Sequence, residues 1–144
     1  MPHKLKLKKI GPGAKLPVRV TPGSAGIDLY AARKKVIPTS CTMLVDTDWA
    51  IEIPAGYVGL IKVNSGIAVQ DNITENAGIV DCDYRGPLKV AIANVSDRPF
   101  KIYKGDRIGQ LILLPYWKGD VEEVKELSET DRGEKGFGQA SNSN

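Results

Sequence analysis

Histidine and cysteine are scarce in this chain of 144 residues, which contains one histidine and two cysteines. The single histidine, His3, stands near the start of the chain, so neither a Cys/His zinc site nor a histidine-based nucleophilic triad is expected. The cysteines, Cys41 and Cys82, come without a secretory signal and indicate no disulfide framework. Acid–base chemistry must therefore come from carboxylates, lysines, tyrosines or a bound metal ion.

A strong net charge and a long apolar run are also missing. The formal net charge is +3 at pH 7, which is too small to indicate bulk nucleic-acid binding. No apolar run approaches the roughly 20 residues of a membrane-spanning helix, and the first residues form no apolar signal core. We therefore expect an intracellular protein, in cytoplasm or nucleus, with neither a nucleic-acid nor a membrane partner.

Helical periodicity is absent as well, because no long segment has an apolar stripe at helical spacing. Short apolar and β-branched runs recur instead between Gly, Pro, Asp and Asn, for example at 42–45, 49–53, 57–61, 88–92 and 108–114. This pattern predicts an all-β sandwich or barrel with one short helix at 65–70. We predict one β domain over residues 1–127 and a flexible, polar, glycine-rich arm over residues 128–144.

The start of the chain is rich in lysine, with Lys4, Lys6, Lys8 and Lys9. Lysines that alternate with apolar residues are typical of a protected edge strand, because their charge discourages pairing with another chain. A binding arm is the alternative, and the edge strand is the favoured interpretation.

The most informative segment runs from Ala77 to Gly86 and places two carboxylates and an aromatic ring after a turn of small residues. Gly78 allows another molecule to approach the backbone closely. Asp81 follows an apolar pair that indicates a short strand, and a carboxylate at a strand end can hold and deprotonate a water molecule. Tyr84 can cover a flat ring or block a sugar hydroxyl. The set suits a nucleotide, although a polar turn explains the spacing equally well.

Four further segments carry polar groups that fit a nucleotide site but also have plainer explanations. Asp28 lies between apolar residues, as in a strand that enters the core beside a surface turn. Residues 64–66 open the expected helix, where backbone N–H groups suit phosphate oxygens, although an ordinary helix cap has the same pattern. Gln110 lies in an apolar run and needs a partner, either backbone or ligand. Arg132 and Phe137 either remain idle in the arm or close over a ring and phosphates as a lid.

Taken in order, these five segments resemble those of the trimeric dUTP pyrophosphatases (dUTPases). The match extends from residues 16–19 and 21–31 to Phe137 and Gly138. The resemblance implies a distorted jelly-roll or β-barrel fold assembled as a homotrimer, with active sites at subunit interfaces that the arm of another chain completes. It also implies hydrolysis of dUTP to dUMP and pyrophosphate, with Mg²⁺ as the cofactor.

The resemblance assigns binding of the base and the sugar to the region around the segment from Ala77 to Gly86. It implies that Asp81 orients the attacking water and that Tyr84 lies under the deoxyribose, where a 2′-hydroxyl would clash. A hairpin is expected to bind the uracil edge through its backbone, and its residues are Asn76, Ala77, Gly78 and Ile79. Such a narrow hairpin rejects the methyl group of thymine, while its donors and acceptors distinguish uracil from cytosine.

The same resemblance implies a set of residues that binds the phosphates and an arm that closes over the site. Ser65 and Gln110 join Asp81 in the implied catalytic set, and Asn64 and Gly66 lie beside them as phosphate contacts. Asp28 is expected to hold Mg²⁺ through water. In the arm, the residues with implied roles are Arg132, for the terminal phosphate, and Phe137 with Gly138, for stacking over uracil.

Position 64 departs from the usual pattern of the family, because Asn64 replaces an arginine that supports phosphate binding and the docked arm. Asparagine is neutral and short, and losing a charged hydrogen bond costs on the order of 1.5–3 kcal/mol. From sequence alone, Asn64→Arg is expected to tighten triphosphate binding or to raise the rate of hydrolysis. In the arm, Lys135 stands where the family commonly has a small or polar residue, and the run 139–141 is Gln-Ala-Ser instead of Ser-Thr-Gly.

These departures keep an alternative open: a dUTPase-fold protein with weakened catalysis that acts as a protein-binding or regulatory module. A deoxycytidine triphosphate deaminase is a weaker third interpretation, because the hairpin supplies no obvious glutamate base near C4. The persistence of the carboxylates favours the active enzyme. Glu75, in the hairpin, is expected to repel a polyanion unless it points away.

Overall fold

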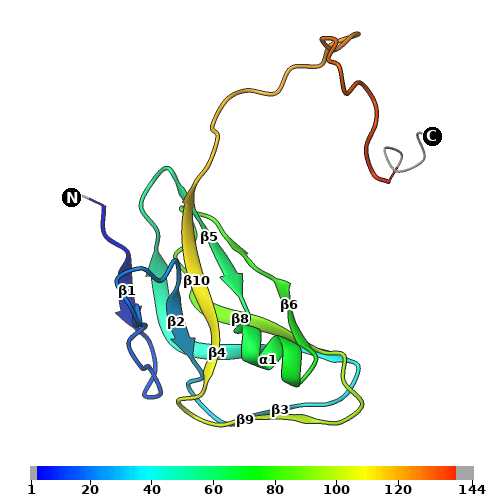
Figure 1. Cartoon of the computed structure of the whole chain (residues 1–144). Coiled ribbons are helices and arrows are strands. Elements are labelled where there is room, and N and C mark those ends of the chain that lie inside the picture. The colour runs from blue at the N-terminus through cyan, green and yellow to red at the C-terminus, as the bar shows by residue number, and fades with distance from the viewer. Residues whose placement is uncertain (1–2, 139–144) are drawn as a thin grey trace.

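The computed structural model describes residues 3–138, which form ten strands and one helix (Figure 1). The elements in chain order are β1 (Lys6–Lys9), β2 (Ile27–Tyr30), β3 (Lys35–Ile37), β4 (Cys41–Glu52), β5 (Tyr57–Lys62), α1 (Ser65–Gln70), β6 (Ile73–Ala77), β7 (Ile79–Val80), β8 (Pro87–Asn94), β9 (Phe100–Ile102) and β10 (Arg107–Pro115). The predicted all-β fold with one short helix is confirmed. Among these residues no helix is long and apolar enough to cross a membrane.

Within residues 3–138 the strands form two four-stranded sheets, in the orders β1-β4-β8-β6 and β2-β10-β5-β7, and a pair of β3 with β9. Strand β8 alternates only over its first residues, since Leu88 and Val90 are buried on either side of the exposed Lys89, whereas Ala91 and Ile92 are both buried. Buried side chains of both large sheets pack into one core, in which Leu29 and Leu111 join residues of β8. The result is a jelly-roll-like arrangement of open sheets rather than a closed barrel.

Strand β1 contains the lysine-rich start of the chain and forms the edge of its sheet, paired with β4. Lys6 Nζ lies 3.0 Å from Glu52 Oε2 in an exposed ion pair. Lys8 and Lys9 are exposed along the same strand. The interpretation of this segment as a charged edge strand is confirmed.

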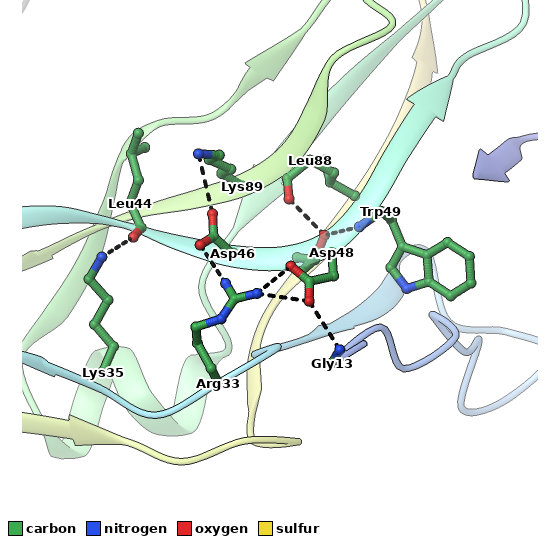
Figure 2. Close-up of polar contacts among 10 residues, drawn as sticks. Gly13, Arg33, Lys35, Leu44, Asp46, Asp48, Trp49, Leu88 and Lys89 are labelled. Atoms are coloured by element: carbon green, nitrogen blue, oxygen red, sulfur yellow. Dashed lines mark hydrogen bonds and ion pairs between the residues drawn. The ribbon is translucent and has the colours of Figure 1, made fainter. Parts of the chain in front are cut away.

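A polar network centred on Asp48 holds the loop before β2 against β4 (Figure 2). The Gly13 N–H donates to Asp48 Oδ2 at 3.0 Å, and Arg33 donates to both carboxylate oxygens at 2.7 and 2.8 Å. Burial raises the pKa of Asp48, but the bonds from Arg33 and Gly13 outweigh it, so this pKa lies below its usual value. The loop continues to Val18, whose carbonyl accepts the Asp28 N–H at 2.8 Å. The network therefore supports the strand that contains Asp28.

After β10 the chain leaves the body of the protein as an extended arm (Figure 1). Residues 116–138 form neither helix nor strand, and Trp117, Val121 and Leu127 in this segment are exposed. The predicted domain boundary at residue 127 and the flexibility of the arm stay predictions.

Candidate active site

Strands β6 and β7, the hairpin of the sequence analysis, join the two large sheets, since β6 is an edge strand of one and β7 an edge strand of the other. Among the described residues β6 pairs with β8 and β7 with β5, so the two strands turn at Gly78 without pairing with each other. Asn76 and Ala77 lie in β6, and Gly78 follows. The Gly78 carbonyl accepts the Ile61 N–H at 2.7 Å, and a Cβ at position 78 would lie 2.7 Å from the Ile61 carbonyl oxygen. Glycine is therefore required because β5 passes so close. The sequence analysis expected another molecule to approach Gly78 closely, and in the structure strand β5 makes this close approach.

Asp81 and Tyr84 line one cavity of about 280 Å³ at the end of β7. The Tyr84 N–H donates to the Asp81 carbonyl at 3.1 Å, and the Tyr84 hydroxyl donates to the Pro87 carbonyl at 2.7 Å. A Cβ at Gly86 would lie 2.5 Å from the Tyr84 hydroxyl oxygen, so glycine lets the ring lie against the backbone. The other lining residues are Leu44, Ile61, Ile79, Val80, Pro87, Leu88, Lys89 and Ala91. A carboxylate and a fixed aromatic ring thus share a mostly apolar cavity.

Glu75 in β6 does not present a free charge to this region. Its carboxylate forms an ion pair with Lys62 and accepts the Val63 N–H at 3.2 Å. Partial burial raises the pKa of Glu75, but the bonds from Lys62 and the backbone outweigh it, so the pKa lies below its usual value. Because Lys62 compensates the charge, the expected repulsion of a polyanion is reduced.

Cys82 and Asp83, the neighbours of Asp81, line a different cavity of about 430 Å³ together with Tyr116 and Asp81 itself. Cys82 Sγ lies 3.5 Å from the Tyr116 hydroxyl. This bond, burial and the charges of Cys82, Asp83 and Asp81 raise the pKa of Tyr116. The sequence analysis missed Tyr116, and only the fold brings it next to this segment.

Asp28 and Gln110 face each other across the pairing of β2 with β10. Asp28 is buried and its Oδ2 lies 3.3 Å from Arg107 Nη1. A Cβ at Gly26 would lie 2.6 Å from Gln110 Oε1, so the glycine leaves room for the amide. Arg107 and Gln110 are three positions apart, which in a regular strand puts them on opposite faces. The register shift between Arg107 and Gly109 brings both beside Asp28.

Sequence reasoning missed Arg107. The available indication was indirect, since a buried Asp28 needs a cationic or hydrogen-bonding partner. Nothing in the sequence identified which cation this was, because the two residues are 79 positions apart and pair only through the sheet.

Asn64 and Gly66 line a further cavity of about 420 Å³ together with Arg107. Helix α1 begins at Ser65, and the Asn64 carbonyl accepts the Ala68 N–H at 3.0 Å. A Cβ at Gly66 would meet nothing within 4 Å, so the backbone there is open. The remaining lining residues are Gln70, Asp71, Phe100, Lys101, Ile102, Asp106 and Ile108.

The site residues predicted from sequence thus form two groups within one chain. Asp81, Tyr84 and Ile79 line the first cavity, and Asn64 and Gly66 line the other with the Asp28 partner Arg107. In the described part of the chain, no residue lines both of these cavities. One protomer therefore brings together each half of the predicted site but does not bring the two halves into one cavity.

The arm residues lie in neither cavity. Arg132 Nε donates to the Lys135 carbonyl at 2.7 Å, and the Gly133 N–H donates to the Thr130 hydroxyl at 3.1 Å, which forms a local turn. Phe137 is fully exposed with φ of 49°, and φ of Gly138 is 90°. The sequence departures at Gln139, Ala140 and Ser141 lie outside the described residues.

Among residues 3–138, no group of three or more His, Cys, Asp or Glu side chains could hold a metal ion by itself. Asp28 contributes one carboxylate, already bonded to Arg107. Magnesium commonly keeps several waters and binds through one or two carboxylates plus substrate phosphates. The single carboxylate of Asp28 therefore suits a hydrated Mg²⁺ that binds together with a polyphosphate. It suits a metal ion held by the protein alone less well.

Comparison with known proteins decides the family. The family model described as dUTPase matches residues 13–141. This chain belongs to the dUTPase family. The deoxyuridine 5′-triphosphate nucleotidohydrolase of Avian adenovirus 8 is 44% identical over 137 residues, which cover 95% of this chain and 84% of that protein. The enzyme of the same name from Candida albicans is 42% identical over 136 residues, covering 93% and 86%.

A solved dUTPase structure supports the same assignment. The G164S mutant of the Staphylococcus bacteriophage 80alpha dUTPase, with dUpNHpp, superposes with a TM-score of 0.90 at 28% identity. The alignment covers 95% of this chain and 98% of that one. The resemblance noted in the sequence is therefore confirmed for the family and the fold.

Proposed function

We propose that this dUTPase hydrolyses dUTP to dUMP and pyrophosphate and that Asp81 orients the attacking water. The observation that carries the proposal is the shared cavity of Asp81 and Tyr84, directly after the hairpin that Gly78 closes against β5. A cavity of about 280 Å³ with an aromatic wall suits a nucleoside. The named relatives act on this nucleotide, which supports the same substrate here.

The residues suggest a direct displacement at the α-phosphorus. Asp81 accepts a hydrogen bond from the water, and the water oxygen attacks in line with the bond to the leaving oxygen. The new P–O bond forms as the bond between the α-phosphorus and the bridging oxygen breaks. The water proton passes to Asp81, and pyrophosphate leaves with the electron pair. Tyr84 holds the sugar in place so that the attack geometry is maintained.

We propose that the second group of residues, around Asn64 and Asp28, binds the phosphates and compensates their negative charge. Gln110, the Ser65–Gly66 backbone and Arg107 are candidates for hydrogen bonds to phosphate oxygens, and Arg132 of an arm is a candidate for the terminal phosphate. When bound, Mg²⁺ would neutralise phosphate charge. Asp28 is the residue proposed to hold it, through water and with Arg107 fixing the carboxylate.

We propose a homotrimer in which each active site uses more than one chain. Two observations support it: the Asp81 cavity and the Asn64 cavity have no lining residue in common among the described residues, and the arm extends away from its own body. A second copy can supply the missing half, and an arm can cover the site. Closed symmetric assembly repeats such an interface around the ring.

The activity is tested by the release of pyrophosphate from dUTP, dTTP, dCTP and UTP with Mg²⁺. We expect dUTP to be hydrolysed far faster than the other three. Asp81→Asn is the matched control, because asparagine keeps the shape but cannot take up the proton. Turnover of wild-type protein no faster than that of Asp81→Asn would overturn the enzymatic assignment and leave the binding or regulatory alternative.

Site sharing is tested by mixing two inactive variants, Asp81→Asn and Gln110→Ala, after dissociation and reassembly. The two variants are mixed in equal amounts, so each half of a site is wild type in half of the chains. If the two halves come from different chains, about a quarter of all sites in the reassembled protein contain both wild-type residues. A rise of the activity toward about a quarter of the wild-type value supports the proposal. Mixed trimers with no recovery would show that each site lies within one chain.

A further inference from the structure

Asp81 lies between two cavities, and the reaction proposed above uses one of them for the nucleoside. In the part of the chain that the structure describes, it is the single residue that lines both the cavity of about 280 Å³ with Tyr84 (the Tyr84 cavity) and the cavity of about 430 Å³ with Tyr116 (the Tyr116 cavity). Asp81 is exposed. A nucleoside that fills the Tyr84 cavity covers that side of the residue. The Tyr116 cavity is then the side of Asp81 that stays open to water.

Strand pairing places the Tyr116 cavity beside Asp81. In the antiparallel pairing of β5 with β7, the position after Val80 comes opposite Val58, which lines this cavity. Tyr116 follows the end of β10, and its N–H donates to the Gly56 carbonyl at 3.3 Å, just before β5 begins. Three neighbouring strands of one sheet, β10, β5 and β7, therefore build the second side of Asp81.

The Tyr116 cavity has polar walls that suit water. Asp83, Cys82 and the Tyr116 side chain line it, whereas the Tyr84 cavity is mostly apolar. Cys82 Sγ lies 3.5 Å from the Tyr116 hydroxyl oxygen. This bond and burial raise the pKa of Tyr116, and the charges of Asp83 and Asp81 add to the rise, so the hydroxyl keeps its proton at neutral pH and can donate to water. An ordered water needs about three partners, and these three side chains supply one donor and two acceptors.

The nearest cations are bound to other groups. Arg85 Nη1 donates to a backbone carbonyl of the same turn at 2.7 Å, and its Nε lies 3.2 Å from Glu52 Oε1. Lys118 Nζ lies 5.5 Å from the centre of the Tyr116 ring, over its face. Asp81 and Asp83 are both exposed, and exposed carboxylates accept hydrogen bonds from water. The two carboxylates are therefore available to hold water between them.

We propose that the attacking water enters through the Tyr116 cavity and that Asp83 is a positioning residue that holds it against Asp81. The inference rests on the proposed hydrolysis and adds the route of its water and its proton. The water oxygen bonds to the α-phosphorus as pyrophosphate leaves with the electron pair, and the water proton passes to Asp81. From Asp81 the proton passes to a second water in the Tyr116 cavity and so to the solvent. Nucleoside and water thus occupy opposite sides of one carboxylate.

Filling the cavity from β5 tests the route without altering the segment that contains Asp81. We expect Val58→Phe to lower kcat for dUTP about ten-fold, because the water no longer reaches its attack position. Binding of dUpNHpp should be unchanged, since Val58 does not line the Tyr84 cavity. Val95→Phe is the matched control, because Val95 is exposed and lines neither cavity. An unchanged kcat in Val58→Phe, or equal losses of kcat and dUpNHpp affinity, would overturn the proposal.

Cys82 allows the same cavity to be filled after the protein has folded. Cys41→Ser leaves Cys82 as the single thiol of the chain. Alkylation of this variant with N-ethylmaleimide, followed by mass spectrometry, should lower kcat about ten-fold and leave dUpNHpp binding unchanged. The same reagent should change nothing in Cys41→Ser/Cys82→Ser. Complete alkylation of Cys82 without a fall in kcat would contradict the route.

The role of Asp83 is tested by comparing Asp83→Ala with Asp83→Glu. We expect the alanine variant to lose about five-fold in kcat at unchanged KM, as for one lost hydrogen bond to the water, and the glutamate variant to retain most of the activity. A loss in KM alone would show that Asp83 acts on substrate binding instead. Wild-type turnover no faster than that of Asp81→Asn would overturn the proposed hydrolysis itself. Full activity in both proteins with a filled Tyr116 cavity would overturn this inference alone.

Discussion

The Asp81 side and the Asn64 side of this dUTPase are built in different ways. Around Asp81, bonds between near neighbours shape the cavity: Tyr84 bonds to the Asp81 and Pro87 carbonyls. Around Asn64, polar residues near α1 meet Lys101 of β9 and Arg107 of β10, and one acceptor has no partner among the described residues. The first half is fixed by bonds within its own segment, whereas the second half contains a buried acceptor without a partner among the described residues.

The strongest test of this contrast is Asp81→Asn on the preformed side. We expect kcat to fall by about 10³-fold, the scale of a lost general base, with a much smaller change in KM because the nucleoside contacts persist. Steady-state pyrophosphate release measures both constants. A fall confined to KM would mean that Asp81 binds substrate instead of activating water.

Truncation before Arg132 removes the contacts expected from another copy. We expect kcat/KM for dUTP to fall by about 10²-fold, because a closing segment no longer holds the phosphates in place, while the proposed trimer persists. Sedimentation and steady-state kinetics measure the two effects. Truncation after Gly138 is the control and should act weakly; dissociation of the trimer by the longer truncation would instead make the arm structural.

Gly78→Ala tests how closely the hairpin is fitted to β5. The new Cβ would lie 2.7 Å from the Ile61 carbonyl oxygen, so the hairpin must shift, at a cost of about 1–3 kcal/mol of stability. We expect kcat/KM to fall about ten-fold. Gly23→Ala, with nothing within 4 Å of its Cβ, is the matched control. Equal behaviour of the two variants in thermal unfolding and kinetics would refute the fitted hairpin.

The smallest effect on activity is expected from Asp48→Asn. This substitution weakens the polar network that supports the strand containing Asp28 (Figure 2). Because the folded-state pKa of Asp48 is lowered, its charge stabilises the fold above the unfolded pKa of about 4. This contribution is lost as pH falls through the folded value. The stability difference between wild type and Asp48→Asn should therefore be constant above about pH 5 and shrink in more acidic solution. Urea unfolding at several pH values measures it, and a difference that grows toward acid would contradict the assigned sign.

The Asp81 half could be predicted from sequence because its residues are close together in the chain. Asp81 and Tyr84 are three positions apart, and the turn between them is closed by their own backbone. The lysine-rich edge strand and the helix at 65–70 were predicted for the same reason, since alternation and local pattern determine them.

The Asn64 half could not be predicted in the same way. The partnership of Asp28 with Arg107 depends on a register shift in β10, and a shift of one residue moves side chains to the other face. The buried Asn64 oxygen without a partner is likewise specified by no local pattern. For Gly78 the sequence analysis predicted a close approach by another molecule, whereas the close contact in the structure is the Ile61 carbonyl of β5.

The sequence by itself determined the residue types available for chemistry. With one histidine and no Cys/His zinc site expected, acid–base chemistry had to come from carboxylates, lysines, tyrosines or a bound metal ion, and the order of motifs indicated the family. The tertiary structure decided which residues far apart in the chain meet: Asp28 lies beside Arg107 and Gln110, and neither half of the site shares a cavity with the other in one protomer. The physical reason is that strand pairing and register, which join residues far apart in the chain, are set by the packing of the whole core.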